Sequence, residues 1–359
     1  MFLIAHNGAR IWGGAERATA MLLAGLQSRG HRVLLLCNDQ LVASEASKRG
    51  VPTRIRAIGG DIALPDAFRL AESLRELKPD AFLIGTYKKL ALAGLGAQLA
   101  GVPRVVARVG LESDTPRNAK YRIALRRWID AVAVNSRAMA QPFENLAGFG
   151  PDKVTVIHNG VTPPVARARP GTLRATLRIP AQAHVVGTVC RVAKQKRIDR
   201  LIDAMAILPA NVHCIVAGEG PGRIELERRC DELALRTRVH FLGHRDDVGD
   251  VLGALDVFIV SSDKEGMSNA MLEAMALGVP VVSTRVSGAQ DALSPTAAGA
   301  TAGTIVDFSP RAIAEAASAI LSDPSRRSQM AHAGRELASG EFSFEKMLDR
   351  WEAFLRPAR

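Results

Sequence analysis

The sequence contains few cysteines and no long apolar run. Cys37, Cys190, Cys214 and Cys230 are scattered, without a CxxC pair or a histidine cluster at metal-ligand spacing, which predicts buried small side chains rather than disulfides or zinc ligands. No apolar run approaches the roughly 18 residues that a membrane-spanning helix needs. The start, MFLIAHNGAR, has neither a basic segment nor a small-residue cleavage site, so it is not expected to be a secretory signal. We therefore predict a cytoplasmic protein.

Acidic residues are scarce in the first half of the chain. Residues 1–170 hold 24 of the 47 Lys and Arg residues but only 13 of the 36 Asp and Glu residues. The densest basic stretch, residues 117–137, contains a single acid, Asp130, against Arg117, Lys120, Arg122, Arg126, Arg127 and Arg137. Such a segment suits an anionic membrane surface at the inner face of the cell membrane, a phosphorylated lipid or an acidic glycan, unless it is simply a solvated helix face. No nucleic-acid-binding signature accompanies the charge, so nucleic acid is not an expected partner.

The length and patterning of the chain predict two α/β domains. At 359 residues it is too long for one core, and 47% hydrophobic with 23% charged residues is a globular composition. Apolar strand patterns alternate with helical patterns from FLIAHN to GTIVDF, which predicts doubly wound parallel sheets. The Pro-, Gly- and Arg-rich stretch 159–171 separates the two series. We expect domains over residues 1–165 and 172–340, with a helix in 341–359 that packs back on the first domain.

Two domains joined in this way are expected to face each other across a cleft, with ligands at the carboxyl ends of the strands. Gly13 and Gly14 follow the first strand and precede a helix, where bare backbone can approach a phosphate. Arg191 and Lys196 follow the first strand of the second domain and can converge on a diphosphate. The glycine-rich VAGEGPG, residues 216–222, either borders a nucleotide site or is an ordinary turn.

The stretch EGMSNAMLEAMALGVPVV, residues 265–282, places two acids around a helix start. Ser268 and Asn269 are good N-caps, so free N–H groups are expected in front of the helix. Such a start favours phosphate and sugar oxygens, and Glu273 one turn later can accept hydrogen bonds from a ribose diol. Glu265 can then hold a transferred sugar. The alternative is two exposed acids that merely bracket a helix.

In this order, the motifs resemble the retaining glycosyltransferases of family 4. The set consists of GGAER, Arg-x4-Lys, GEGP, RVHFLGH and E-x7-E followed by ALGVPVVSTRVSG, and it is most specific over residues 187–290. The resemblance implies the GT-B architecture of two facing Rossmann-like domains. It also implies transfer of a hexosyl or N-acetylhexosaminyl group from a nucleotide diphosphate sugar to a glycan or lipid-linked acceptor, as in polysaccharide or lipopolysaccharide synthesis. The implied mechanism is front-side attack, with neither a metal nor another cofactor; a UDP-sugar is the first expectation and a GDP-sugar the second.

The resemblance also assigns roles to individual residues. Residues matching Arg191 and Lys196 hold the departing diphosphate, Glu265 contacts the sugar, and Glu273 holds the ribose. Further donor contacts are implied for Gly13, Gly14, Glu219, His244, Arg245, Gly266, Met267, Ser268 and Asn269. Many family members carry a histidine after the fifth strand, where this chain has VARVGLESDTPRN. Glu112 or Asp114 is expected to take its place on the acceptor side, together with Lys120.

Other enzyme classes fit the sequence less well. A nucleotide-sugar epimerase of the same fold stays open, although the Arg, Lys and E-x7-E set favours transfer. A nicotinamide-dependent dehydrogenase would need GxGxxG after the first strand and a ribose-binding acid after it, and both are missing. A non-catalytic subunit would have eroded motifs, whereas these are intact.

Overall fold

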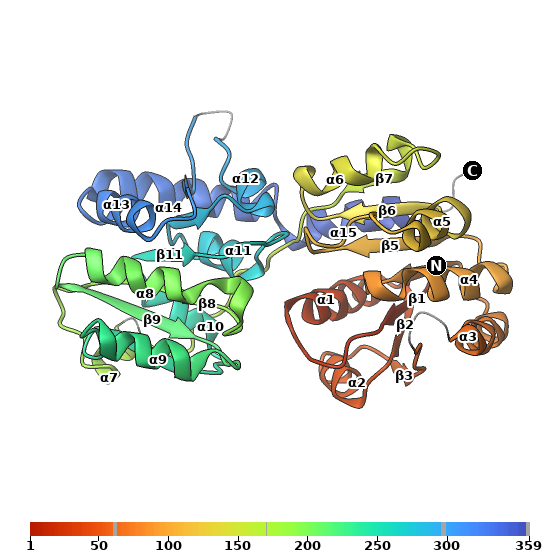
Figure 1. Cartoon of the computed structure of the whole chain (residues 1–359), viewed down its shortest axis with the longest axis horizontal. Helices are drawn as coiled ribbons and strands as arrows, with labels where there is room; N and C mark the ends of the chain where they lie inside the picture. The colour runs from red at the N-terminus through yellow and green to blue at the C-terminus, as the bar shows by residue number, and fades with distance from the viewer. Residues whose placement is uncertain (60–62, 170, 296–298, 357–359) are drawn as a thin grey trace. The chain divides into compact units, whose positions relative to one another are not determined.

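The chain forms two compact units, each built on one parallel sheet (Figure 1). The computed structural model describes residues 1–59, 63–169, 171–295 and 299–356. The first unit comprises Met1–Asn159 and Met347–Arg359, and the second comprises Gly160–Lys346. The division therefore falls at the start of the Pro-, Gly- and Arg-rich stretch.

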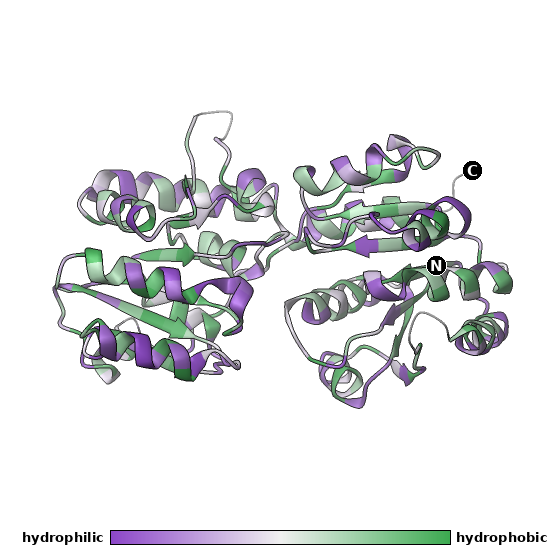
Figure 2. Cartoon of the chain, in the orientation of Figure 1, coloured by the Kyte–Doolittle hydropathy of each residue, from purple (hydrophilic) through white to green (hydrophobic). Residues whose placement is uncertain are grey.

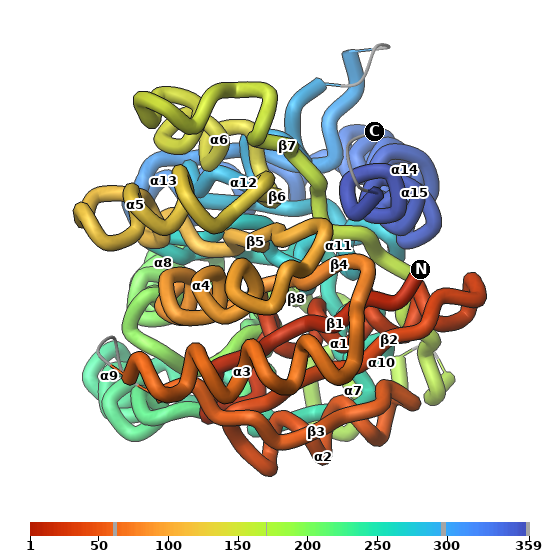
Figure 3. The backbone as a smooth tube through the Cα atoms, turned by 90° about the vertical axis from the view of Figure 1, so that its right-hand side faces the viewer, coloured from red at the N-terminus to blue at the C-terminus, as the bar shows by residue number. Residues whose placement is uncertain are grey.

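The sheet of the N-terminal unit has the strand order β3-β2-β1-β4-β5-β6-β7 among the described residues. Its strands are β1 (Phe2–Asn7), β2 (Arg32–Cys37), β3 (Thr53–Ile55), β4 (Ala81–Ile84), β5 (Val105–Val109), β6 (Ala131–Val134) and β7 (Val154–Val156). The helices between them are α1 (Gly14–Ser28), α2 (Gln40–Ser47), α3 (Leu64–Leu77), η1 (Tyr87–Lys89), α4 (Leu90–Ala100), α5 (Ala119–Trp128), α6 (Arg137–Glu144) and η2 (Pro151–Lys153). Every residue of β1 is buried, because helices cover both faces of the sheet. Figure 3 shows α3 and α4 side by side, and these two helices pack against each other.

The sheet of the C-terminal unit has the order β10-β9-β8-β11-β12-β13 among the described residues. Its strands are β8 (His184–Val189), β9 (Val212–Ala217), β10 (Val239–Gly243), β11 (Val257–Val260), β12 (Val281–Thr284) and β13 (Gly303–Val306). Its helices are α7 (Thr172–Thr176), η3 (Lys194–Lys196), α8 (Ile198–Ile207), α9 (Arg223–Glu232), α10 (Val248–Gly253), α11 (Asn269–Ala276), α12 (Ser287–Ala292), α13 (Pro310–Leu321) and α14 (Pro324–Ser339). In register, β8 runs beside β9 from His184 opposite Val212 to Val189 opposite Ala217.

The core of the C-terminal unit lies on both faces of its sheet. Val185 joins a cluster with residues of α10, α11 and α12, whereas the next residue, Val186, joins a cluster with α8, α9 and α13. Successive strand residues point to opposite faces, so an apolar run rather than an alternating pattern marks each strand. Figure 2 accordingly shows β9 mostly in the hydrophobic colour and the outer helix α9 mostly in the hydrophilic one.

The C-terminal helix α15 (Phe344–Leu355) contributes its last part to the N-terminal unit. Arg29 pairs with Asp349 at 2.8 Å, and His31 Nε2 lies 2.9 Å from Glu352 Oε1. The apolar stripe of the helix is buried at Met347, Leu348, Trp351, Phe354 and Leu355. The contacts of Asp349 and Glu352 lie within the N-terminal unit, to which Met347 and the described residues after it belong.

Each apolar run expected to be a strand is one, and the predicted fold class is confirmed. Of the cysteines, Cys37, Cys214 and Cys230 are buried, Cys190 is half-buried, and all four are free thiols. Among the described residues, no helix is both long and apolar enough to cross a lipid bilayer.

Candidate functional site

The C-terminal sheet has its switch point between β8 and β11, where the strand order reverses. Ligands of doubly wound sheets bind at this point, beyond the carboxyl ends of the two strands. The loop after β8, residues 190–197, contains Arg191 and Lys196, and the loop after β11, residues 261–268, contains Glu265. Two motifs far apart in the sequence therefore meet at the place where a ligand is expected.

Lys196 and Glu265 form an ion pair at this switch point. Lys196 Nζ lies 2.6 Å from Oε1 and 2.5 Å from Oε2 of Glu265, and Ser262 Oγ lies 3.0 Å from Oε2. The two side chains are only 16% and 14% exposed, so each charge depends on the other. Glu273 is 8% exposed within α11. The alternative of two exposed acids bracketing a helix is therefore wrong.

The loop between the two acids is held in place by its neighbours. Ser268 is the N-cap of α11, as expected, and its Oγ accepts a hydrogen bond from the N–H of Met271 at 3.3 Å. Ser287 Oγ, at the start of α12, donates to the carbonyl oxygen of Glu265 at 2.8 Å. Gly266 packs so closely on α12 that a Cβ at Gly288 would lie 1.9 Å from its carbonyl oxygen. The loop of residues 265–269 is thus packed and hydrogen-bonded against α12.

The glycine-rich stretch after β9 lies against the loop after β8. A Cβ at Gly218 would lie 1.9 Å from the Cys190 carbonyl oxygen, and one at Gly220 would lie 2.2 Å from that of Val192. The Val192 N–H donates to the Glu219 carbonyl at 2.8 Å, while the Glu219 side chain pairs with Arg223 at 2.8 Å. These glycines are required because two backbones touch, and the stretch borders the loop of Arg191.

His244 and Arg245 follow β10, which is separated by β9 from the switch-point strand β8. His244 is 76% exposed and lies 3.3 Å from Asp246, and Arg245 Nε lies 2.7 Å from Asp247 Oδ1. That hydrogen bond raises the pKa of Arg245. Within the described residues, no recorded contact joins either side chain to the pair of Lys196 and Glu265.

Arg191 differs from Lys196 in its surroundings. It is exposed, and its guanidinium makes no recorded hydrogen bond or ion pair with any residue that the structure describes. Its backbone is fixed, because its carbonyl accepts from the Ala193 N–H at 2.9 Å. The two cations predicted for a diphosphate therefore sit on one loop, one paired and the other open to solvent.

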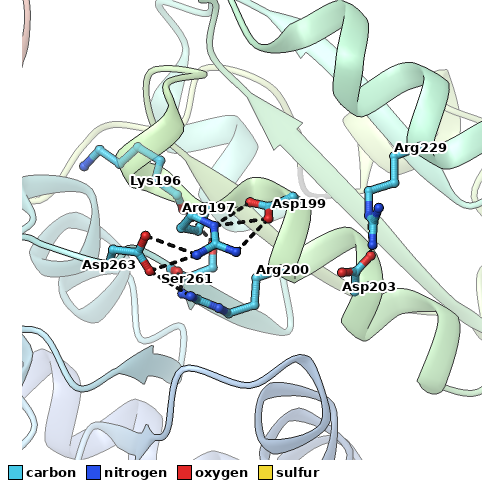
Figure 4. A network of polar contacts seen from close by, with 8 residues as sticks. All are labelled: Lys196, Arg197, Asp199, Arg200, Asp203, Arg229, Ser261 and Asp263. Atoms are coloured by element: carbon cyan, nitrogen blue, oxygen red, sulfur yellow. Dashed lines mark hydrogen bonds and ion pairs between the residues drawn. The ribbon is translucent and has the colours of Figure 1, made fainter.

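A network of charged side chains beside this loop was missed by sequence reasoning. Figure 4 shows the Arg197 guanidinium between the carboxylates of Asp199 and Asp263, and Arg200 reaching the same Asp263. Burial alone would raise the pKa of Asp263, but the hydrogen bonds from Arg200 and Arg197 outweigh it and lower that pKa. The only sequence signal was the charge density of KQKRIDR, which is equally typical of a solvated surface.

In the N-terminal unit, Gly13 and Gly14 stand at the start of α1. Gly13 is the N-cap in an extended conformation. Among the residues that the structure describes, a Cβ at Gly13 would meet only the Glu16 carboxylate, at 3.1 Å, and one at Gly14 would meet none within 4 Å. Within the described part of this unit, the start of α1 therefore has room for a close backbone approach.

His6, on β1 at the switch point of the same sheet, was also missed. It is fully buried, and its Nε2 lies 3.0 Å from Asn38 Oδ1. The Asn38 amide is oriented by Ile58, whose N–H donates to Oδ1 and whose carbonyl accepts from Nδ2. His6 Nε2 must therefore carry the proton, and Nδ1 has no recorded hydrogen bond among the described residues. Burial lowers the pKa of His6 to about 4, against smaller opposing effects of Asn38 and the Arg56 backbone.

Glu112, Asp114 and Lys120 lie between β5 and the first turn of α5. Glu112 and Asp114 are half-buried, and burial raises the pKa of Asp114 while Lys88 opposes the shift. Lys120 Nζ lies 4.4 Å from the centre of the Tyr121 ring, which lies 4.6 Å from that of Tyr87. This segment thus joins a carboxylate of raised pKa to an aromatic pair at the carboxyl edge of the sheet. Among the described residues, no group of three or more His, Cys, Asp or Glu side chains could hold a metal ion.

Two family models match most of the chain. Residues 171–337 match the model described as "Glycosyl transferases group 1", and residues 12–163 match "Glycosyltransferase Family 4". The lipopolysaccharide core biosynthesis glycosyltransferase LpsE of Rhizobium meliloti is 37% identical over 179 residues, which are 50% of this chain and 51% of LpsE. The chain thus spans about half the length of that relative.

Two further similarities extend over more of the chain. A GDP-mannose-dependent alpha-(1-6)-phosphatidylinositol dimannoside mannosyltransferase of Mycobacterium tuberculosis is 28% identical over 334 residues, 88% of this chain and 85% of that protein. The solved structure of Anabaena HepE in complex with UDP and glucose has a TM-score of 0.85 and 21% identity, and the match covers 98% of each chain. At this identity the structural similarity concerns the fold alone.

Proposed function

Because the chain belongs to glycosyltransferase family 4 and has the GT-B fold, we propose that it transfers a hexosyl or N-acetylhexosaminyl group from a nucleotide diphosphate sugar to a glycan or lipid-linked acceptor. The observation that carries the proposal is the contact of Lys196 with Glu265 at the switch point of the C-terminal sheet. A UDP-sugar is the first candidate donor, since HepE was solved with UDP and glucose, and a GDP-sugar is the second, since the mycobacterial relative is GDP-mannose-dependent. The relation to LpsE supports lipopolysaccharide or another glycoconjugate as the product.

The proposed roles follow from the charge and position of each side chain. Arg191 and Lys196 bind the diphosphate and stabilise the negative charge that grows on it as it leaves. Glu265 holds the donor sugar, Glu273 holds the ribose, and the N–H groups of residues 267–269 face the sugar and phosphates. Lys196 can serve both Glu265 and a phosphate oxygen, because its ammonium group has three N–H donors.

We propose front-side attack with retention of the anomeric configuration. The bond from the anomeric carbon to the phosphate oxygen breaks as the acceptor oxygen bonds to the same face, and the acceptor proton passes to that phosphate. Fixed cations supply the stabilisation that a divalent ion would otherwise give, so activity is expected to survive excess EDTA. Loss of activity that added Mg²⁺ restores would contradict this part, and the anomeric coupling of the product in NMR would test retention.

A thermal-shift panel of UDP, GDP and ADP with their sugars tests the donor site. A bound nucleotide stabilises the folded state by mass action, so one base is expected to raise the melting temperature. Arg191→Ala and Lys196→Ala are expected to reduce that shift. The absence of a shift with every nucleotide would refute the proposal. Incubation with labelled donor, with and without acceptor glycan, then separates transfer from epimerisation.

We also propose that residues 117–137 bring the enzyme to an anionic acceptor or membrane surface. On α5, Ile123 is 51% exposed and is surrounded by the exposed Arg122, Arg126 and Arg127. Sedimentation with anionic vesicles should weaken with salt and with Arg126→Glu/Arg127→Glu, but not with Arg311→Glu/Arg326→Glu in the C-terminal unit. Equal binding to neutral vesicles would contradict the proposal.

A further inference from the structure

We infer that Asp263 is a positioning residue, which ties the loop after β8 to the loop after β11 and so sets Lys196 against Glu265. The inference rests on the proposed function of these two residues. Asp263 lies two positions before Glu265 and makes its contacts with the other loop through both backbone and side chain. It was not among the residues that the family resemblance assigned.

The contacts of Asp263 lie on both sides of Lys196. Its N–H donates to the Gln195 carbonyl at 2.9 Å, and its carboxylate accepts from Arg197 Nη1 at 3.1 and 3.2 Å. Lys196 itself extends away from this network in Figure 4. The residue before Lys196 and the residue after it are thus bonded to a single residue of the opposite loop.

A buried arginine reinforces the connection. Arg200 is 5% exposed; its Nη1 donates to the Ser261 carbonyl at 2.5 Å and its Nη2 lies 2.7 Å from Asp263 Oδ1. Ser261 Oγ in turn donates to the Lys196 carbonyl at 2.9 Å. Because a buried guanidinium without a counter-charge is costly, the position of Arg200 depends on the carboxylate of Asp263.

The backbone conformation of Arg197 also depends on contacts with carboxylates. Arg197 follows Lys196 with φ +49°, in the left-handed region that residues other than glycine rarely adopt. Its guanidinium is held on one side by Asp199, at 2.9 to 3.1 Å, and on the other by Asp263. A strained residue of this kind persists only where its surroundings determine its conformation.

Asp199 provides a matched control for Asp263. Their side chains are 39% and 41% exposed and bind the same guanidinium. Asp199, however, lies two residues from Arg197 on its own segment, whereas Asp263 belongs to the opposite loop. Asp263→Asn therefore removes a charge that joins the two loops, and Asp199→Asn removes an equivalent charge that does not.

Turnover and donor binding of the two variants test the inference. Since a misplacement near 1 Å can cost about 100-fold in rate, Asp263→Asn is expected to lower kcat by at least about 10-fold, and Asp199→Asn by less than about 3-fold. In a Lys196→Ala background, Asp263→Asn should have no further effect. Equal losses in the two variants, or an undiminished loss in the Lys196→Ala background, would overturn the inference. Asp203→Asn, which breaks the pair with Arg229 drawn in Figure 4, measures the effect of losing another α8 carboxylate.

The effects of Lys196→Ala and Asp263→Asn, alone and together, can also be followed by urea unfolding, which requires no nucleotide. Lys196 and Asp263 share no recorded direct contact in the described residues, so coupling between their effects on unfolding free energy reports the connection between the loops. Asp263→Asn should destabilise the wild-type protein more than the Lys196→Ala variant, and additive effects would overturn the inference. If the wild type binds no nucleoside diphosphate, the proposed function fails while this measurement still decides the role of Asp263.

Discussion

Replacing Gly288 with alanine should displace the loop of residues 265–269 without changing any side chain in it. Gly288 lies in the first turn of α12, and a Cβ there would be 1.9 Å from the Gly266 carbonyl oxygen and 2.5 Å from Met267 Cα. Both neighbours are backbone atoms, so no side-chain rotation can relieve the overlap. Either α12 or residues 266–267 must move.

The size of the movement follows from the contact distances. Contacts of a Cβ below 3.0 Å essentially never occur, so a gap of 1.9 Å must open by more than 1 Å. Glu265 precedes Gly266, and its carboxylate lies 2.6 Å from Lys196 Nζ, a contact that a shift of this size would break. A misplacement of about 1 Å costs roughly 100-fold in rate, and overpacking costs about 1–3 kcal/mol in stability.

Steady-state turnover and thermal unfolding of Gly288→Ala measure these two losses. Gly253→Ala, in α10 of the same unit, is the control, because a Cβ at Gly253 would meet no described residue within 4 Å. The control should keep both its activity and its stability. A Gly288→Ala enzyme with wild-type turnover would refute the view that α12 fixes the position of Glu265.

Four further substitutions, each at a single residue, have expected effects. Lys196→Ala should lower kcat by about 10²- to 10³-fold, whereas Arg191→Ala should mainly weaken donor binding, as separate kcat and Kd measurements would reveal. Ser268→Ala should cost about 1 kcal/mol in urea unfolding, through loss of the N-cap of α11. Burial lowers the pKa of His6 from its ordinary 6.5 to about 4 in the folded state, so between these pH values the unfolded chain binds more protons than the folded protein. The free energy of unfolding should therefore fall by about 3 kcal/mol as the pH drops from 6.5 to 4. His6→Gln should flatten the pH dependence in urea unfolding, and an unchanged slope would contradict the assignment.

The strands could be predicted because burial on both faces leaves a strong local signal. VFIV in β11 and VVST in β12 are buried throughout, and such runs stand out between helical patterns. The N-cap Ser268 was predictable for a similar reason, since the cap and the N–H group that it accepts from lie three residues apart.

The network around Asp263 could not be predicted in this way. Arg197 and Asp263 are 66 residues apart, and they meet because β8 and β11 are neighbours in the sheet. Strand patterns show that strands exist but not which of them are adjacent. Gly218 and Gly220 illustrate the same limit, because their function is to let the loop after β9 touch the loop after β8. In the sequence, His6 was only a polar residue within an apolar strand pattern.

Charge pairing explains why Arg191 and Lys196 should contribute differently to the proposed reaction. At the switch point, Lys196 is paired with Glu265, and Arg197 and Arg200 are paired with carboxylates of the network. Arg191 is exposed and has no recorded side-chain partner among the described residues, so its charge is available to attract an anionic donor. Lys196 divides its N–H donors between Glu265 and the phosphate, so we expect its contact with the phosphate to strengthen as negative charge grows there. Binding should therefore depend more on Arg191, and the rate of the chemical step more on Lys196.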